Sequence, residues 1–143
     1  MESEAPGVLE VAGLGRSFPT PGGRLEVLEG IDLTLAPGRS LVVSGPSGSG
    51  KSTLLNLLGT LDRPTAGTVR LGGVDPFSLP AAGLARFRAR RIGFVFQDHL
   101  LLPQLDAREN VLAAAAALGP VGGAERERAA ALLERLGLAD RLD

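Results

Sequence analysis

The chain has 143 residues, with 15 Lys or Arg against 16 Asp or Glu, and its formal net charge is -1. A chain of this length buries one modest core, so we expect one domain or a part of one. The balanced charge argues against nucleic acid as a partner, because polyanion binding is usually accompanied by a basic excess. The absence of cysteine excludes disulfides and thiolate metal sites and fits a cytoplasmic location. No apolar run approaches the roughly 18 residues that span a bilayer.

The first part of the chain is predicted to contain strands followed by a glycine-rich loop and a helix. Residues 8–11 and 25–35 have strand character, the second through alternation of apolar and polar side chains, and a glycine turn lies between them. Residues 40–44 form an apolar run that predicts a strand leading into the loop. Residues 52–58 carry leucines at helical spacing. Strand, loop and helix are thus in the order that a phosphate-binding loop requires.

The middle of the chain predicts a strand, a basic helix and another strand. Residues 68–71 follow a Pro-Thr-Ala-Gly turn and precede a glycine pair, which is typical of a short strand. Residues 79–91 are expected to be helical with arginines on one face. Residues 92–97 are apolar and strand-like, and they end at the polar pair Gln97 and Asp98.

Two helices are predicted at the end of the chain. Asp106 and Glu109 have the spacing of a reciprocal cap, and the alanine-rich residues 111–118 continue that helix. A second helix is expected from Ala124, with apolar side chains on one face and Gly137 as its stop.

The strongest chemical signal surrounds Lys51, the only lysine among the 15 basic residues. It completes the pattern G-x-x-x-x-G-K-[ST], in which glycines let backbone N–H groups approach a polyphosphate and the lysine reaches its terminal phosphates. Ser52 would bind Mg2+ through its hydroxyl, and Thr53 could contact a phosphate nearer the sugar. A glycine-rich turn that merely caps a helix is the alternative. The pattern reads Gly45-Pro46-Ser47-Gly48-Ser49-Gly50-Lys51-Ser52.

Four further segments accompany the loop: Leu61-Asp62-Arg63-Pro64-Thr65-Ala66-Gly67, Arg91-Ile92-Gly93-Phe94-Val95-Phe96-Gln97, Leu101-Leu102-Pro103 and Glu109-Asn110-Val111. In their order and spacing they resemble the ATP-binding domain of ABC transporters, most closely the lipoprotein-releasing and macrolide-export group. The resemblance runs from about residue 8 to residue 143.

The resemblance implies an α/β fold of the P-loop NTPase type, with an N-terminal antiparallel β subdomain and the start of a helical subdomain. Residues 1–143 would be the N-terminal part of such a domain. About residues 1–44 would supply β subdomain strands, residues 45–98 the core from the phosphate loop to the Q-loop, and residues 99–143 the start of the helical subdomain. The implied function is ATP binding and hydrolysis coupled to transport, with ATP and Mg2+ as cofactors.

The resemblance also implies roles outside the loop. Phe18 would stack on adenine, with an ordinary core residue near a strand end as the less favoured alternative, and Gln97 would be the Q-loop glutamine that touches Mg2+. A transmembrane permease would dock near Gln97 to Asn110, which places the protein at the inner face of the cell membrane. A second ATP-binding domain would pair head to tail. His99, the sole histidine, matches no family motif and has no neighbouring metal ligands.

The chain departs from the family because it contains no Leu-Ser-Gly-Gly-Gln signature, no second acidic strand end and no switch histidine. We therefore expect weak or absent ATPase activity from these 143 residues alone. One alternative is a small P-loop kinase that uses Asp98 for Mg2+ and a lid of arginines, namely Arg86, Arg88, Arg90 and Arg91. Another is a nucleotide-binding fragment without turnover.

Overall fold

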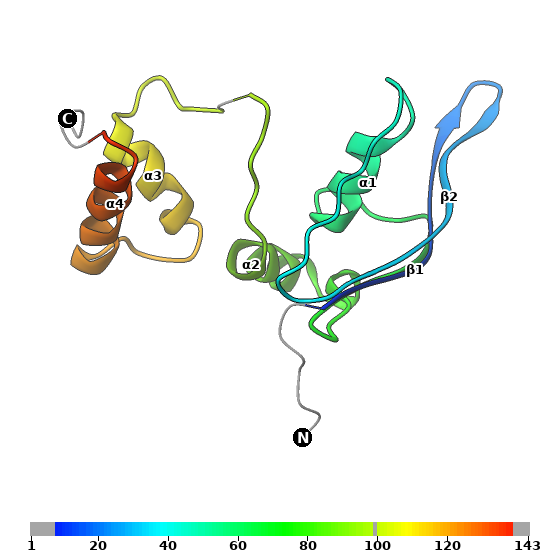
Figure 1. The fold of residues 1–143 in the computed structure, drawn as a ribbon, viewed down its shortest axis with the longest axis horizontal. Helices are drawn as coiled ribbons and strands as arrows, with labels where there is room; N and C mark the ends of the chain where they lie inside the picture. The colour runs from blue at the N-terminus through cyan, green and yellow to red at the C-terminus, as the bar shows by residue number, and fades with distance from the viewer. Residues whose placement is uncertain (1–7, 99, 139–143) are drawn as a thin grey trace. The chain divides into compact units, whose positions relative to one another are not determined.

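The computed structural model describes residues 8–98 and 100–138. The prediction for His99 lies outside the described residues. The chain divides into two compact units, residues 1–88 and 89–143, coloured from blue to green and from green to red in Figure 1. The three segments expected from the family, about residues 1–44, 45–98 and 99–143, are not the same as these two units. They stay a prediction.

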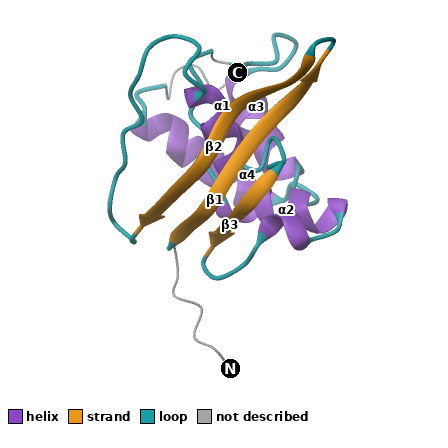
Figure 2. Cartoon of the chain, turned by 90° about the vertical axis from the view of Figure 1, so that its right-hand side faces the viewer, coloured by secondary structure: helices purple, strands orange, loops and turns teal. Residues whose placement is uncertain are grey.

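The first unit is built on a three-stranded antiparallel sheet, as expected. Its strands are β1 (Leu9–Thr20), β2 (Gly23–Leu35) and β3 (Ala66–Leu71), in the order β2-β1-β3 (Figure 2). β1 is much longer than the predicted residues 8–11, because its backbone is paired with β2 as far as the hairpin turn. Strand length here depends on the pairing partner as well as on the local sequence.

Helix α1 (Lys51–Leu58) packs against this sheet and closes the core of the first unit. The predicted helical spacing is confirmed, since Leu54 and Leu57 point inward while Leu55 is 56% exposed. Burial of such side chains contributes about 1.5–3 kcal/mol each. The buried residues of this hydrophobic core are Val11, Leu14, Leu28, Leu54, Leu57 and Val69.

Two predicted strands are wrong. Residues 40–44 and 92–97 form no strand, and Val42 and Val95 are 85% and 102% exposed. A β-strand needs hydrogen-bonded neighbours for its backbone groups, and within the described residues neither segment has a paired strand. An apolar run is therefore not sufficient to form a strand.

In the sequence, the strands are followed by the short 3-10 turn η1 (Pro76–Ser78) and then by helix α2 (Ala81–Arg91). α2 confirms the predicted helix and begins two residues later than the predicted start at residue 79. Its Arg88 donates from Nη1 to the Thr60 carbonyl at 3.0 Å. α2 has no acidic residue in its first turn.

The second unit contains α3 (Ala107–Ala116) and α4 (Gly123–Arg135), and it confirms the predicted capping of α3. The Asp106 carboxylate accepts from the Glu109 N–H at 2.7 Å, and the Glu109 carboxylate accepts from the Asp106 N–H at 3.1 Å. This reciprocal pair satisfies two donors that a helix start leaves unpaired. In the described part of the chain no helix is both long and apolar enough to cross a membrane.

The ends of α4 follow the same local rules. The Glu125 carboxylate accepts hydrogen bonds from its own backbone N–H and from that of Gly122, and both lower the pKa of Glu125. At the other end Gly137 has φ 73, and the N–H groups of Gly137 and Leu138 bond to the carbonyls of Glu134 and Leu133. These two backbone hydrogen bonds form a Schellman motif, so Gly137 is confirmed as the stop of the helix.

Candidate functional site

The glycine-rich loop ends where α1 begins, and its last glycine is required there. Gly50 is the N-cap of α1 with φ 85, a left-handed conformation that favours glycine. A Cβ at Gly50 would lie 2.9 Å from Leu28 Cδ2 and 3.0 Å from the Val27 carbonyl oxygen. The loop therefore packs directly on β2, and no larger residue fits at its end.

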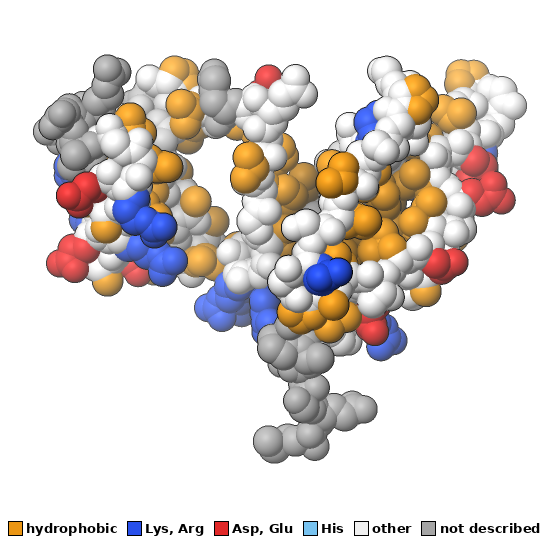
Figure 3. Space-filling model, in the orientation of Figure 1, with side chains coloured by type: hydrophobic (Ala, Val, Ile, Leu, Met, Phe, Trp, Pro, Cys, Tyr) orange, Lys and Arg blue, Asp and Glu red, His pale blue; other side chains and the backbone are white. Residues whose placement is uncertain are grey.

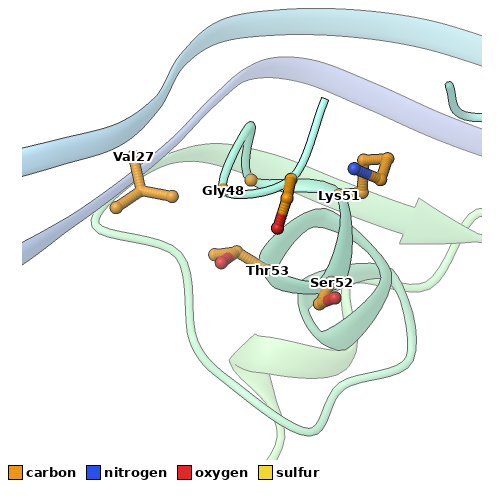
Figure 4. A pocket seen from close by; sticks show the side chains of 7 residues that line it. Val27, Gly48, Lys51, Ser52 and Thr53 are labelled. Carbon is orange, nitrogen blue, oxygen red and sulfur yellow. The ribbon is translucent and has the colours of Figure 1, made fainter. Parts of the chain in front are cut away.

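This packing leaves a cavity of about 490 Å³ over the first turn of α1. Figure 4 shows Val27 on its strand facing the loop. In the same view the Thr53 side chain extends from α1 on the side where Val27 lies. The lining combines loop residues, including one serine, with two helix hydroxyls, one cation and one apolar strand residue. Its residues are Val27, Ser47, Gly48, Gly50, Lys51, Ser52 and Thr53.

Val27 belongs to this site because of an irregularity in strand pairing. Arg16 pairs with Leu28 and the next residue, Ser17, pairs with Glu26, so Val27 is an extra residue in β2. Such a bulge redirects a side chain out of the regular alternation. Val27 is not among the predicted site residues, because the alternation of residues 25–35 contains no signal for a bulge.

Lys51 supplies the positive charge of the site. Its Nζ donates to the carbonyl oxygens of Gly45 and Pro46 at 2.9 and 2.6 Å, so the ammonium is held against the loop. An ammonium has three donors, which leaves one N–H for a ligand. The N-terminal end of α1 adds a favourable potential for anions, and its first turn contains no acidic residue.

Ser52 and Thr53 provide oxygen ligands beside this charge. Neither hydroxyl makes a hydrogen bond within residues 8–98 and 100–138, so both are available to a ligand. A hydroxyl at this place suits Mg2+, which prefers a few protein oxygens together with phosphate oxygens and water. The same described residues contain no group of three or more His, Asp or Glu side chains that could hold a metal without such help.

Phe18 lies near the cavity but not in its lining. It pairs with Leu25 across the hairpin, and Leu25 is two residues from Val27, a separation of about 7 Å along a strand. Phe18 is half-buried and outside the hydrophobic cluster. The guanidinium of Arg16 lies 4.3 Å from the centre of its ring.

Gln97 belongs to the second unit, where it is exposed in a bend. The loop that follows exposes three leucines, Leu100, Leu101 and Leu102, at 63%, 59% and 43%. Asn110 organises the end of this loop: its side chain accepts from the Leu102 N–H at 2.8 Å and donates to the Leu105 carbonyl at 2.9 Å.

Comparison with known proteins adds three findings. A family model described as "ABC transporter" matches residues 28–143. The chain is 51% identical over 134 residues to a lipoprotein-releasing system ATP-binding protein, LolD 1, of Rhodopirellula baltica, covering 94% of this chain and 58% of that protein. It is 48% identical over 136 residues to a macrolide export ATP-binding/permease protein, MacB 1, of Aeromonas hydrophila, covering 95% of this chain and 21% of that protein.

Among solved structures the chain is similar to the ATP-binding cassette MJ0796. The dimeric, post-hydrolysis structure of that cassette bound to ADP and Pi has a TM-score of 0.82 and 33% sequence identity. The match covers 94% of this chain and 59% of the cassette. The chain thus spans a little over half of the length of these single-cassette relatives.

Proposed function

The chain belongs to the ABC transporter family, and on that premise we propose that its glycine-rich loop is the ATP site of a transporter's nucleotide-binding component. The observation that carries the proposal is the arrangement at the start of α1. There a left-handed glycine, the Lys51 ammonium and a helix N-terminus converge on one cavity of about 490 Å³. This is the environment that a nucleotide's phosphates require.

The remaining roles at this site are assigned from the family resemblance. The proposal assigns the phosphates to Gly45, Pro46, Ser47, Gly48, Ser49, Gly50, Lys51, Ser52 and Thr53. Mg2+ would be held by Ser52 together with phosphate oxygens, with Gln97 as a further ligand, and it would neutralise phosphate charge. Phe18 would stack on the base, since its partner Leu25 is only about 7 Å along β2 from the cavity wall.

The whole protein would couple ATP binding and hydrolysis to export or to lipoprotein release. The names of the LolD and MacB relatives support this class of transport. A permease would dock near Gln97 to Asn110, where the second unit exposes the leucines of residues 100–102. A second cassette would pair head to tail with this one, and the dimeric state of the MJ0796 structure supports pairing of two cassettes. With these associations the protein would lie at the cytoplasmic face of a membrane.

The kinase alternative has no observation in its favour. It requires the α2 arginines as a phosphate lid, but Arg88 donates to the backbone carbonyl of Thr60. The similar solved structure is that of an ATP-binding cassette.

Replacing Lys51 with alanine tests the proposal. We expect Lys51→Ala to weaken Mg-ATP binding by at least about tenfold, because a hydrogen bond to a charged group contributes about 1.5–3 kcal/mol. Isothermal titration calorimetry on the 143-residue chain measures the affinity, and circular dichroism checks the fold.

Arg39→Ala is the matched control, since Arg39 is an exposed cation shortly before the loop and outside the cavity lining. Its affinity should equal that of the wild type. Equal Mg-ATP affinity in Lys51→Ala and the wild type would contradict the assignment of the loop.

A further inference from the structure

Arg16 on β1 forms a two-pronged ion pair with Asp62, which follows α1 in the chain. Its Nε lies 2.8 Å from Asp62 Oδ2, and its Nη2 lies 2.8 Å from Asp62 Oδ1. The two side chains are only 20% and 30% exposed. A planar guanidinium held at two of its three nitrogens has a defined orientation, unlike a lysine ammonium.

The same guanidinium lies over the ring of Phe18, 4.3 Å from its centre. Residues two apart on a strand share a face, so Arg16 and Phe18 are natural neighbours. A cation over an aromatic face is attracted by the ring quadrupole. One face of the Phe18 ring is therefore covered by a group that two hydrogen bonds hold in place.

Asp62 in turn is tied to the helix that starts at the phosphate loop. Its carboxylate accepts from the Arg63 N–H at 2.8 Å, and its backbone N–H donates to the Asn56 carbonyl at 3.3 Å. The neighbouring Leu61 N–H donates to the same carbonyl at 2.8 Å. A continuous set of contacts thus runs from Phe18 through Arg16 and Asp62 to the body of α1.

We propose that Arg16 is a positioning residue for nucleotide binding: held by Asp62, it fixes the half-buried Phe18 ring so that the base stacks on the face opposite Arg16. The inference rests on the proposed function and extends it to a residue that makes no contact with phosphate. Holding the ring in one orientation before binding lowers the ordering cost of the stack. The Arg16–Asp62 pair also keeps the Phe18 ring at a fixed position relative to α1, which carries the phosphate site.

A merely structural ion pair predicts something different. It would join β1 to the loop after α1 and lower the free energy of unfolding when broken, with no preference for one ligand over another. The positioning role predicts a selective loss, because only a ligand with a base uses Phe18. Inorganic triphosphate has the phosphates of ATP and lacks the base, so it separates the two roles.

The test compares Mg-ATP with magnesium triphosphate by calorimetry on the 143-residue chain. We expect Arg16→Gln to weaken ATP binding by about fivefold to tenfold, a large part of the effect of one base stack, and to leave triphosphate binding unchanged. Phe18→Leu should have the same selectivity. The double variant should be no weaker than Phe18→Leu alone, because Arg16 acts through that ring.

Three further variants control the experiment. Arg16→Lys keeps the charge without the fork and should recover part of the ATP preference, and Asp62→Asn should lower it while leaving Arg16 in the chain. Arg70→Gln, an exposed arginine elsewhere on the sheet, should change nothing. If Arg16→Gln does not fold by circular dichroism, Asp62→Asn provides the same comparison.

The outcomes separate the inference from the function on which it rests. Equal losses for both ligands, additive losses in the double variant, or an unchanged ATP preference in Arg16→Gln and Asp62→Asn would each overturn the inference alone. If the wild-type chain binds Mg-ATP no more tightly than magnesium triphosphate, both the base site and the inference are wrong. A wild-type chain that binds neither ligand would overturn the proposed function.

Discussion

At the scale of single residues, the site depends on what one ammonium and two hydroxyls can reach. Lys51 is folded back on the carbonyls of Gly45 and Pro46, which holds a compact charge over the first turn of α1. A guanidinium is larger and planar, so it would not occupy the same position. The hydroxyls of Ser52 and Thr53 make no hydrogen bond within the described part of the chain. They are therefore available to Mg2+ or to phosphate oxygens.

Ser52→Ala should remove most of the magnesium dependence of ATP binding. We expect the apparent Mg2+ affinity of the ATP complex to fall by about tenfold or more, because a fixed oxygen ligand is lost. Calorimetric titration of ATP with Mg2+ and with chelator measures this difference. Ser47→Ala removes another hydroxyl of the same cavity and should retain the full magnesium dependence; similar behaviour of the two variants would count against Ser52 as a ligand.

At the scale of elements, helix starts are built in two different ways. α3 begins with an Asp106–Glu109 capping box, in which side chains satisfy the first backbone donors. α1 begins at Gly50 with no side-chain cap, which leaves backbone N–H groups at its start for a ligand. The helix at the proposed phosphate site is thus the one whose start has no side-chain cap, whereas the start of α3 is capped.

Asp106→Ala should lower the free energy of unfolding of the second unit by about 1 kcal/mol, the usual cost of removing an N-cap. Urea denaturation followed by circular dichroism at 222 nm measures the change. Asp106→Asn keeps an oxygen acceptor at the cap and should retain most of the stability. A loss as large in Asp106→Asn as in Asp106→Ala would show that the capping hydrogen bond is not the cause.

At the scale of the whole molecule, many large apolar side chains are exposed in the described part of the chain. Hydrophobic side chains reach the surface over both units (Figure 3). The clearest cases are the two apolar segments that form no strand, where Val42 is 85% and Val95 102% exposed. Uncovered apolar segments with strand propensity favour association with other chains.

Val95→Thr and Val42→Thr should reduce self-association without destabilising the fold. Threonine keeps the branched shape and replaces one methyl group by a hydroxyl, and exposed substitutions usually change the free energy of unfolding by no more than about 0.5 kcal/mol. Light scattering after size exclusion measures association. Leu25→Thr, a single exposed position on the hairpin, is the control; an equal effect there would mean that the two segments have no special role.

The sequence by itself determined the features that depend on neighbours in the chain. The phosphate-loop pattern, the Asp106–Glu109 cap, the Gly137 stop and the helical spacing of Leu54 and Leu57 are all local, and the structure contains each of them.

Only the tertiary structure decided the features that join distant segments. The bulge that turns Val27 into the cavity depends on the register of β1 against β2, and Arg16 meets Asp62 across 46 residues of chain. The absence of strands at residues 40–44 and 92–97 has the same origin, because a strand exists only where another strand satisfies its backbone hydrogen bonds.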